Sequence, residues 1–209
     1  MIGCPNQGDI KRKKSAGKAI LAWIIVLAIL AAGVFVFVSV FYEDAKKKLD
    51  EMNYPRTYST YVEKAAKDYD LDPALIYAVI HTESGFDPKA ESGVGAKGVM
   101  QMMPSSFEWL QEQRGCAEQY TEDDLFDPEI CIDYGSYLLK YFYDYYGTER
   151  SAIAAYNAGF VVSDWLNDTN YSSDGKNLDS IPYPETKNYV DKVESAKEMY
   201  IKLYYSQSN

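Results

Sequence analysis

An unbroken apolar run near the N-terminus is the feature that most constrains this chain. Residues 19–41 form a stretch of 23 residues without a charged side chain, and Ser39 is the only hydroxyl-bearing residue among them. As an α-helix this run would be about 34 Å long, enough to cross a bilayer core of about 30 Å. A core helix of that length would show polar positions on one face. The sequence therefore predicts one transmembrane helix over residues 19–42.

Basic residues on the two sides of the run predict its orientation. Five Lys or Arg side chains precede it and three follow it, as Lys46, Lys47 and Lys48. This bias favours a cytoplasmic tail over residues 1–18 and an extracytoplasmic remainder, joined to the membrane by a charged connector over residues 43–56. A cleaved signal peptide is the alternative, although its apolar core would be longer than usual. Cys4 precedes the run, so it is misplaced for a lipoprotein cleavage site.

The charge and the cysteine and histidine content exclude several classes of function. Residues 43–209 hold 16 Lys or Arg against 30 Asp or Glu, a net charge of −14. This argues against nucleic acid as a partner, because phosphate binding needs a basic patch, and it is compatible with a sugar polymer. His81 is the only histidine, so no zinc-type spacing and no histidine-based triad can be built. We expect no metal and no cofactor, and a structural or solvent-facing role for His81.

The segment over residues 57–209 has the pattern of a mainly α domain. Asp-Pro pairs, lone prolines and glycines mark helix starts and ends, and no strand pattern of any length is present. A short hairpin within 85–98 is an open alternative, and residues 168–182 have the composition of a loop. The expected helices span residues 57–69, 73–84, 104–113, 128–146, 148–158 and 184–204.

One carboxyl group stands out in this pattern. Asp72 is a good N-cap and Pro73 suits the first helical position. Leu75, Val79 and Glu83 follow at spacings of four, so Glu83 should lie along or beside an apolar face. A carboxyl group held partly out of water has a raised pKa, the state that a general acid needs. The alternative is a glutamate of a last helical turn that points to solvent.

Three sequence blocks carry a resemblance to a known family. Residues 83–104 read ESGFDPKAESGVGAKGVMQMMP, residues 155–159 read AYNAG, and residues 185–190 read ETKNYV. Together they resemble the lytic transglycosylases of the soluble-lytic-transglycosylase (SLT) type, over roughly residues 57–204. The resemblance implies a lysozyme-like helical domain that acts on peptidoglycan. The glycines of the first block lack the preceding strand and the lysine of a phosphate-binding loop, so a tight turn close to a sugar fits better.

The resemblance also implies roles for individual residues. Glu83 would be the catalytic acid, Tyr156 would hydrogen-bond its carboxyl group, and Asn157 would contact the sugar. Apart from the resemblance, Met103 would be assigned to the core and Glu185 to a helix dipole. The full set of implied substrate-binding residues is Ser92, Gln101, Met103, Tyr156, Asn157 and Glu185. Some of the 20 tyrosines should stack on sugar faces.

A single catalytic carboxylate limits the mechanism. Ordinary glycosidases need two carboxylates that flank the scissile bond. The resemblance implies instead that Glu83 protonates the oxygen between MurNAc and GlcNAc, and then deprotonates the MurNAc C6 hydroxyl, which closes onto C1 as a 1,6-anhydro sugar. A goose-type lysozyme-like hydrolase, with Asp87 or another acid positioning water, is one alternative. A non-enzymatic wall-binding component of a secretion or division machine is another.

The cysteines of the exported part suggest one covalent constraint. Cys116 and Cys131 flank an acidic segment, and an even pair in an oxidising compartment can form a disulfide. We expect this disulfide. The alternative is two free thiols, with Cys131 packed as a small apolar residue and Cys116 exposed.

Overall fold

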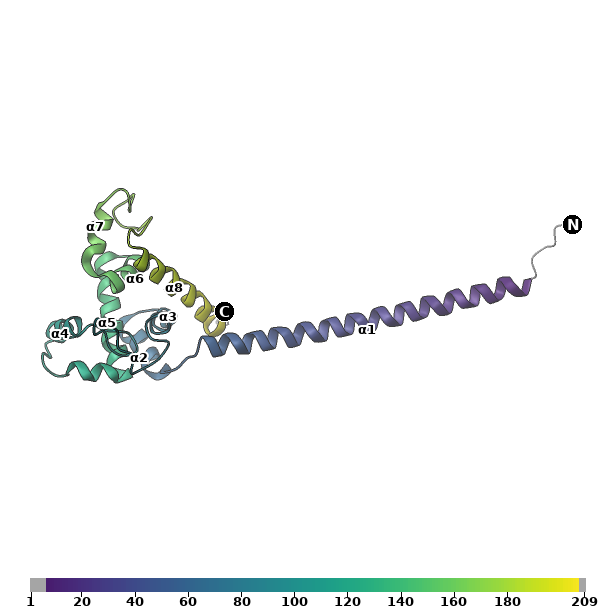
Figure 1. Cartoon of the computed structure of the whole chain (residues 1–209), viewed down its shortest axis with the longest axis horizontal. Coiled ribbons are helices and arrows are strands. Elements are labelled where there is room, and N and C mark those ends of the chain that lie inside the picture. Colours follow the sequence, from purple (N-terminus) through teal and green to yellow (C-terminus); the bar gives the residue numbers. More distant parts are fainter. Residues whose placement is uncertain (1–6, 207–209) are drawn as a thin grey trace. The chain divides into compact units, whose positions relative to one another are not determined.

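The computed structural model describes residues 7–206 of the chain, and side chains from residue 21 onward. Contacts divide the chain into two compact units, which meet in the sequence between Asn53 and Tyr54. Figure 1 shows the helices of both units. The second unit has its own hydrophobic core, and every residue of the three sequence blocks belongs to it.

The first unit is one continuous helix, α1 (Gln7–Asn53), of 47 residues. Its part from Leu21 to Asn53 is long and apolar enough to cross a membrane, and none of the most apolar stretch is buried in the protein. Most of the charged connector expected over residues 43–56 is helical, because α1 continues through it to Asn53. No Gly or Pro interrupts residues 43–53, and Lys47 and Glu51 lie one helical turn apart with a 3.9 Å ion-pair distance.

The second unit is helical, which confirms the predicted mainly α class. Within residues 54–206 no strand is formed, and the hairpin considered for the Gly-rich segment is reduced to isolated bridges that pair Lys97 with Glu91 and Met102. Seven α-helices, two 3₁₀ turns and one π turn make up the unit. They are α2 (Ser59–Tyr69), α3 (Pro73–Glu83), α4 (Pro104–Gln113), η1 (Glu122–Phe126), α5 (Pro128–Tyr146), α6 (Glu149–Ala158), η2 (Gly159–Val161), α7 (Val162–Asn167), α8 (Pro184–Tyr200) and η3 (Ile201–Tyr205).

Local capping chemistry explains why the predicted helix boundaries are close to the observed ones. The Asp72 side chain accepts a hydrogen bond from the Ala74 amide at 2.9 Å, and Asp127 does the same at the start of α5. Thr148 caps α6, and Gly147 ends α5 with a φ of 74°. The short elements η2 and α7 have no comparable capping signal, so the sequence does not predict them.

Helix α3 forms the centre of the core. All residues from Ala74 to Ile80 are buried, so this helix is covered on every side rather than on one face. It packs most extensively against α8, whose residues Tyr189, Val193 and Tyr200 are buried. The terminal helix, predicted to reach residue 204, ends as an α-helix at Tyr200 and continues as the π turn η3, where Ile201 is 37% exposed.

Candidate functional site

Glu83 is the last residue of α3, and the chain turns sharply after it. Its side chain is half-buried. The next residue, Ser84, donates a hydrogen bond from its hydroxyl to the Val99 carbonyl at 2.8 Å and accepts one from the Phe86 amide. Gly85 and Phe86 both have positive φ angles, of 59° and 72°. These contacts hold the end of α3 against the Gly-rich loop of residues 91–102.

The surroundings of Glu83 give it the protonation equilibrium of a general acid. Burial raises the pKa of Glu83 to about 7, and the nearby hydroxyl of Tyr189 opposes this rise. The Tyr189 hydroxyl is buried beside Glu83, and it makes no hydrogen bond of ordinary geometry with any residue that the structure describes. The rise in pKa agrees with the prediction from the sequence. Near neutral pH the carboxyl group is therefore close to half protonated, and it can both give and take a proton.

Two tyrosines come from α6 and α8 to the carboxyl group. The Tyr156 hydroxyl donates to the Met100 carbonyl at 2.9 Å, and not to Glu83 as the resemblance implies. The Tyr189 hydroxyl also lies near the carboxyl group. Burial, with the neighbouring Glu83 charge, raises the pKa of both tyrosines well above the usual range. Both are therefore neutral, and Glu83 is surrounded by uncharged groups.

Two glycines let the Gly-rich loop lie directly on α5 and η1. Gly98 has a φ of 75°, and a Cβ atom there would lie 2.0 Å from the Leu125 carbonyl oxygen and 2.9 Å from the Cys131 sulfur. A Cβ atom on Gly135 of α5 would lie 2.6 Å from the Met100 sulfur. Neither close approach leaves room for a side chain. The Gly-rich loop is therefore packed directly against α5 and η1.

The cysteines do not form the predicted disulfide in this structure. Cys131 is fully buried under the loop, where its sulfur accepts a hydrogen bond from the Met100 amide at 3.4 Å, and burial raises the pKa of this thiol to about 12. Cys116 is a free thiol beside the Gln111 carbonyl and the Tyr134 hydroxyl. The prediction fails because Cys131 serves as a small core residue, as the alternative had it, although Cys116 is half-buried rather than exposed.

Two of the predicted substrate-binding residues brace the loop itself. The Ser92 hydroxyl oxygen accepts a hydrogen bond from the Ala96 amide at 2.9 Å. Gln101, with a φ of 47°, donates from its side-chain amide to the Ala90 and Gly98 carbonyls, both at 3.0 Å. Their remaining polar atoms, the Ser92 proton and the Gln101 side-chain oxygen, make no hydrogen bond within the described part of the chain.

The other predicted residues lie at the surface. Met103 is 38% exposed at the start of α4, and Glu185 is exposed in the first turn of α8. Asn157 is exposed, and its side-chain oxygen accepts a hydrogen bond from the Thr186 hydroxyl at 2.8 Å. This bond joins the second and third blocks. Thr186 and Tyr189 also belong to the site, and although both lie in the third block, the sequence reasoning assigns neither of them a role there.

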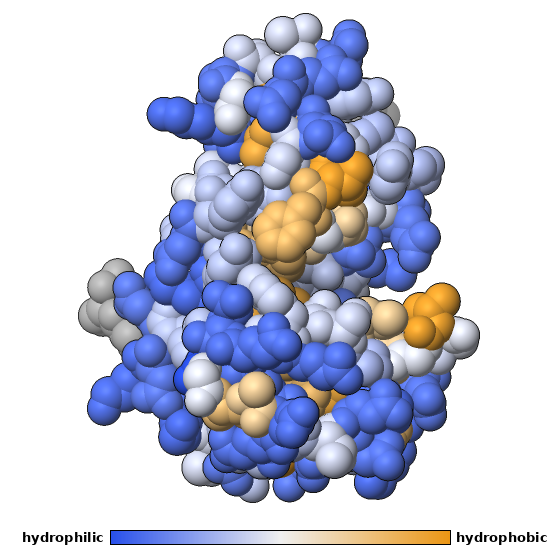
Figure 2. Space-filling model, turned by 90° about the vertical axis from the view of Figure 1, so that its left-hand side faces the viewer, coloured by the Kyte–Doolittle hydropathy of each residue, from blue (hydrophilic) through white to orange (hydrophobic). Residues whose placement is uncertain are grey.

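An aromatic surface continues from the second block. Phe160, three residues after Asn157, is 50% exposed, and its ring lies 5.7 Å from that of Tyr145 and 6.2 Å from that of Tyr141. Tyr141 also packs edge-on against Trp109 at 4.9 Å. Figure 2 shows one face of the molecule, which is mostly hydrophilic and has apolar side chains near its middle. Exposed ring clusters of this kind are typical of interaction surfaces.

The residues from 21 to 206 contain no group of three His, Cys, Asp or Glu side chains arranged to hold a metal ion.

Comparison with known proteins agrees with this architecture. Residues 60–178 match the family model of the transglycosylase SLT domain. A soluble lytic murein transglycosylase of Salmonella typhimurium is 32% identical over 146 residues, which are 68% of this chain and 23% of that protein. A membrane-bound lytic murein transglycosylase C of Actinobacillus succinogenes is 30% identical over 167 residues, covering 69% of this chain and 47% of the relative.

A solved structure shares the fold. The inactive mutant of the lytic transglycosylase Slt from Pseudomonas aeruginosa, in which a glutamate is replaced by glutamine, matches with a TM-score of 0.64 and 30% identity. The match covers 73% of this chain and 25% of that one. The chain thus spans about a quarter of the length of the soluble relatives. The three sequence blocks, the helical fold that joins them and the match over residues 60–178 together show that this chain belongs to the transglycosylase SLT domain family.

Proposed function

We propose that this protein is a membrane-anchored lytic transglycosylase that cleaves the bond between MurNAc and GlcNAc in peptidoglycan. The observation that carries the proposal is the half-buried Glu83, whose pKa is raised to about 7 at the point where the three blocks meet. Relatives named lytic murein transglycosylases, soluble and membrane-bound, support the reaction class. The inactive glutamate-to-glutamine variant of the Pseudomonas relative supports a catalytic glutamate.

The proposed reaction needs only one protein carboxyl group. Protonated Glu83 gives its proton to the glycosidic oxygen, and the bond from MurNAc C1 to that oxygen breaks. The resulting Glu83 carboxylate takes the proton of the MurNAc C6 hydroxyl, whose oxygen attacks C1 and closes the 1,6-anhydro ring. Glu83 ends the cycle protonated, and neither water nor a second carboxylate is consumed. The proton balance suits a group whose pKa is near 7, because the two steps use opposite protonation states.

The hydrolase alternative has less support in the geometry. Asp87, the acid named for positioning water, is exposed, and its carboxylate accepts a hydrogen bond from the Lys89 amide at 2.8 Å. It therefore caps its own loop. The Tyr156 and Tyr189 hydroxyls near Glu83 are neutral and cannot replace a second carboxylate.

The proposed location follows from α1. A helix of this length and hydropathy, with more basic residues before the apolar run than after it, favours a single-pass anchor with the N-terminus in the cytoplasm and the catalytic domain outside. Protease added to spheroplasts should then remove residues 54–209. A mature protein that begins beyond residue 31 would refute the retained anchor and support a cleaved signal peptide.

The decisive experiment is product analysis with a matched pair of variants. The wild-type protein should release 1,6-anhydro muropeptides from sacculi, detected by mass spectrometry, whereas a reducing end would indicate a hydrolase. Glu83→Gln should abolish release because glutamine has no transferable proton, and Asp87→Asn should retain it. Turnover above a few per cent in folded Glu83→Gln would contradict the role of Glu83. Binding of sacculi by the wild-type protein without cleavage would favour a wall-binding component.

A further inference from the structure

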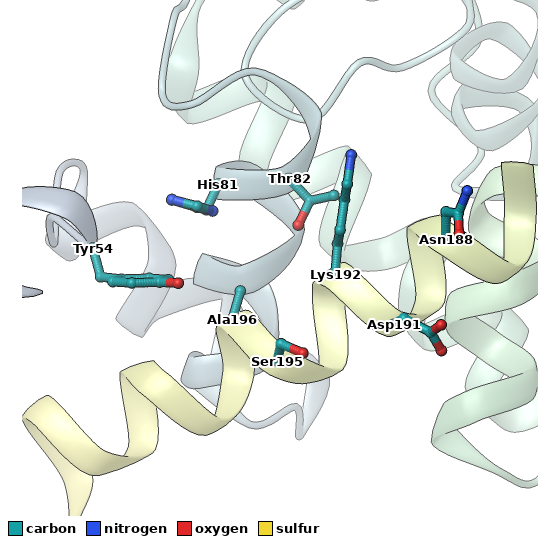
Figure 3. Close-up of a pocket in the computed structure, with 8 residues that line it drawn as sticks. All are labelled: Tyr54, His81, Thr82, Asn188, Asp191, Lys192, Ser195 and Ala196. Carbon is teal, nitrogen blue, oxygen red and sulfur yellow. The ribbon is translucent and has the colours of Figure 1, made fainter.

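Lys97 is a charged residue that the fold buries. It lies in the Gly-rich loop, and only 9% of its side chain is exposed, although residues 43–209 carry a net charge of −14. Lys192, by contrast, is exposed and borders a pocket of about 640 Å³ between α3 and α8 (Figure 3). A lysine is almost never covered in this way unless its charge is paired. The position of Lys97 therefore needs specific partners.

The partners of Lys97 all come from η1. Its ammonium group lies 2.9 Å from the Asp123 carboxylate and 3.2 Å from the Glu122 carboxylate. It also lies 5.4 Å from the centre of the Phe126 ring, within reach of a cation–π interaction. The two carboxylates stay largely in water, at 79% and 56% exposure, whereas the lysine is covered. The Lys97 side chain thus joins the Gly-rich loop to η1.

The backbone of Lys97 closes a tight turn. Lys97 and Met102 exchange two backbone hydrogen bonds, of 2.9 and 3.0 Å, on the two sides of residues 98–101. Inside the turn, the Gln101 amide also donates to the Gly98 carbonyl at 3.1 Å. One residue therefore supplies both the side chain that reaches η1 and an end of the turn, so a displacement of this side chain would displace the turn with it.

The turn lies beside the proposed catalytic carboxyl group. The Met100 carbonyl accepts the hydrogen bond of the Tyr156 hydroxyl, and the Met100 amide donates to the Cys131 sulfur. The charge of Glu83 contributes to the raised pKa of both Tyr156 and Cys131, so both groups are near its carboxyl group. The two backbone groups of Met100 are therefore held close to Glu83.

We propose that Lys97 is a positioning residue: its ion pairs with η1 hold the turn whose Met100 carbonyl fixes the Tyr156 hydroxyl. The proposal rests on the proposed function, because Tyr156 lies beside the carboxyl group that would transfer the proton. Lys97 acts through the turn and takes no part in proton transfer. The tip of the loop is closed by separate hydrogen bonds between Ser92 and Ala96, so loss of the Lys97 ion pairs should change kcat more than KM.

The first test measures kcat and KM on soluble glycan strands with the full chain in detergent. Lys97→Met removes the charge and keeps an unbranched side chain, and it should lower kcat about tenfold while KM changes less than about twofold. Lys97→Arg keeps the charge and should retain most of the activity. Lys89→Met is the matched control, because Lys89 also lies over the Phe126 ring, at 5.3 Å, but makes no ion pair with any residue that the structure describes. It should change neither constant.

A second variant tests the same contact from η1. Glu122→Gln with Asp123→Asn removes both carboxylate charges at exposed positions, where the fold tolerates the change, and leaves Lys97 in place. It should lower kcat about threefold, a smaller loss because salt screens exposed carboxylates. The proposal would be overturned by a normal kcat in this double variant, by a rise in KM alone, or by an equal loss of kcat in Lys89→Met and Lys97→Met.

Amide hydrogen exchange separates this inference from the proposed function. The Met102 amide is bonded to the Lys97 carbonyl, so its exchange reports the closure of the turn whether or not the protein cleaves glycan. Lys97→Met should speed the exchange of residues 97–102 about tenfold, and Lys89→Met should leave it unchanged. If the wild-type protein cleaves no strands, the proposed function fails, and this measurement still decides whether Lys97 holds the turn. Unchanged exchange in Lys97→Met would refute that role.

Discussion

The raised pKa of Glu83 has a cost in stability that can be measured. The pKa of this carboxyl group is raised from 4.5 to about 7 by burial, so the folded state holds the proton more tightly than the unfolded state does. The contribution to stability is therefore fully present below pH 4.5, and it is lost as the pH rises towards 7. From these two pKa values, the free energy of unfolding should fall by about 2.5 kcal/mol between pH 5 and pH 8.5 because of Glu83.

Replacing Glu83 by Gln removes the titrating group and keeps its shape. The assay is urea unfolding of residues 54–209, which form a compact unit of their own, at pH 5, 7 and 8.5. All other groups titrate alike in both proteins, so the difference in unfolding free energy isolates Glu83. The unfolding free energy of Glu83→Gln, relative to that of the wild type, should therefore rise by about 2.5 kcal/mol from pH 5 to pH 8.5. A difference that does not change with pH, or one that moves in the opposite sense, would refute the reasoning. The same variant should be inactive. The buried carboxyl group would then be needed for activity although it lowers the stability of the fold near neutral pH.

Three further predictions concern Tyr189, Gly98 and the two cysteines of the second unit. Tyr189→Phe removes the hydroxyl that lowers the pKa of Glu83, so the alkaline limb of the activity profile should move to higher pH; an unmoved or lowered limb would argue against this effect of Tyr189. Gly98→Ala should destabilise the domain by at least about 2 kcal/mol in urea unfolding, because its Cβ would meet a carbonyl oxygen at 2.0 Å. Gly93→Ala, with open space around it, is the control, and equal costs would contradict the close approach. Thiol counting on denatured, unreduced protein spanning residues 54–209 should find both Cys116 and Cys131 free, and a count of zero would restore the disulfide.

The disulfide shows where sequence reasoning reaches its limit. Cys116 and Cys131 are close enough in sequence for a loop to close between them, and spacing alone favours a bridge. Pairing depends on the direction of each side chain, and that direction is set by what the surrounding helices bury. Cys131 lies beneath the Met100 amide, whereas Cys116 lies beside Tyr134. Distant contacts decided the outcome.

The helix positions, by contrast, were predictable from the sequence. The starts at Pro73, Pro104 and Pro128 and the end at Gly147 agree with expectation. These signals act within one turn of chain, through a cap hydrogen bond or a permitted φ angle, so they need no information from elsewhere. The length of the apolar run is equally local, because it depends only on consecutive residues.

The sequence by itself determined the membrane-length helix, the helical class and the presence of one carboxyl group among three family blocks. Only the tertiary structure decided that the Tyr189 hydroxyl lies near Glu83, and that the Tyr156 hydroxyl donates to the Met100 carbonyl. Tyr189 is more than a hundred residues from Glu83 along the chain, and the packing of α8 on α3 brings the two together. Desolvation depends on every atom that excludes water, whichever part of the chain supplies it, so the pKa of about 7 that makes Glu83 suitable for catalysis is a property of the folded domain.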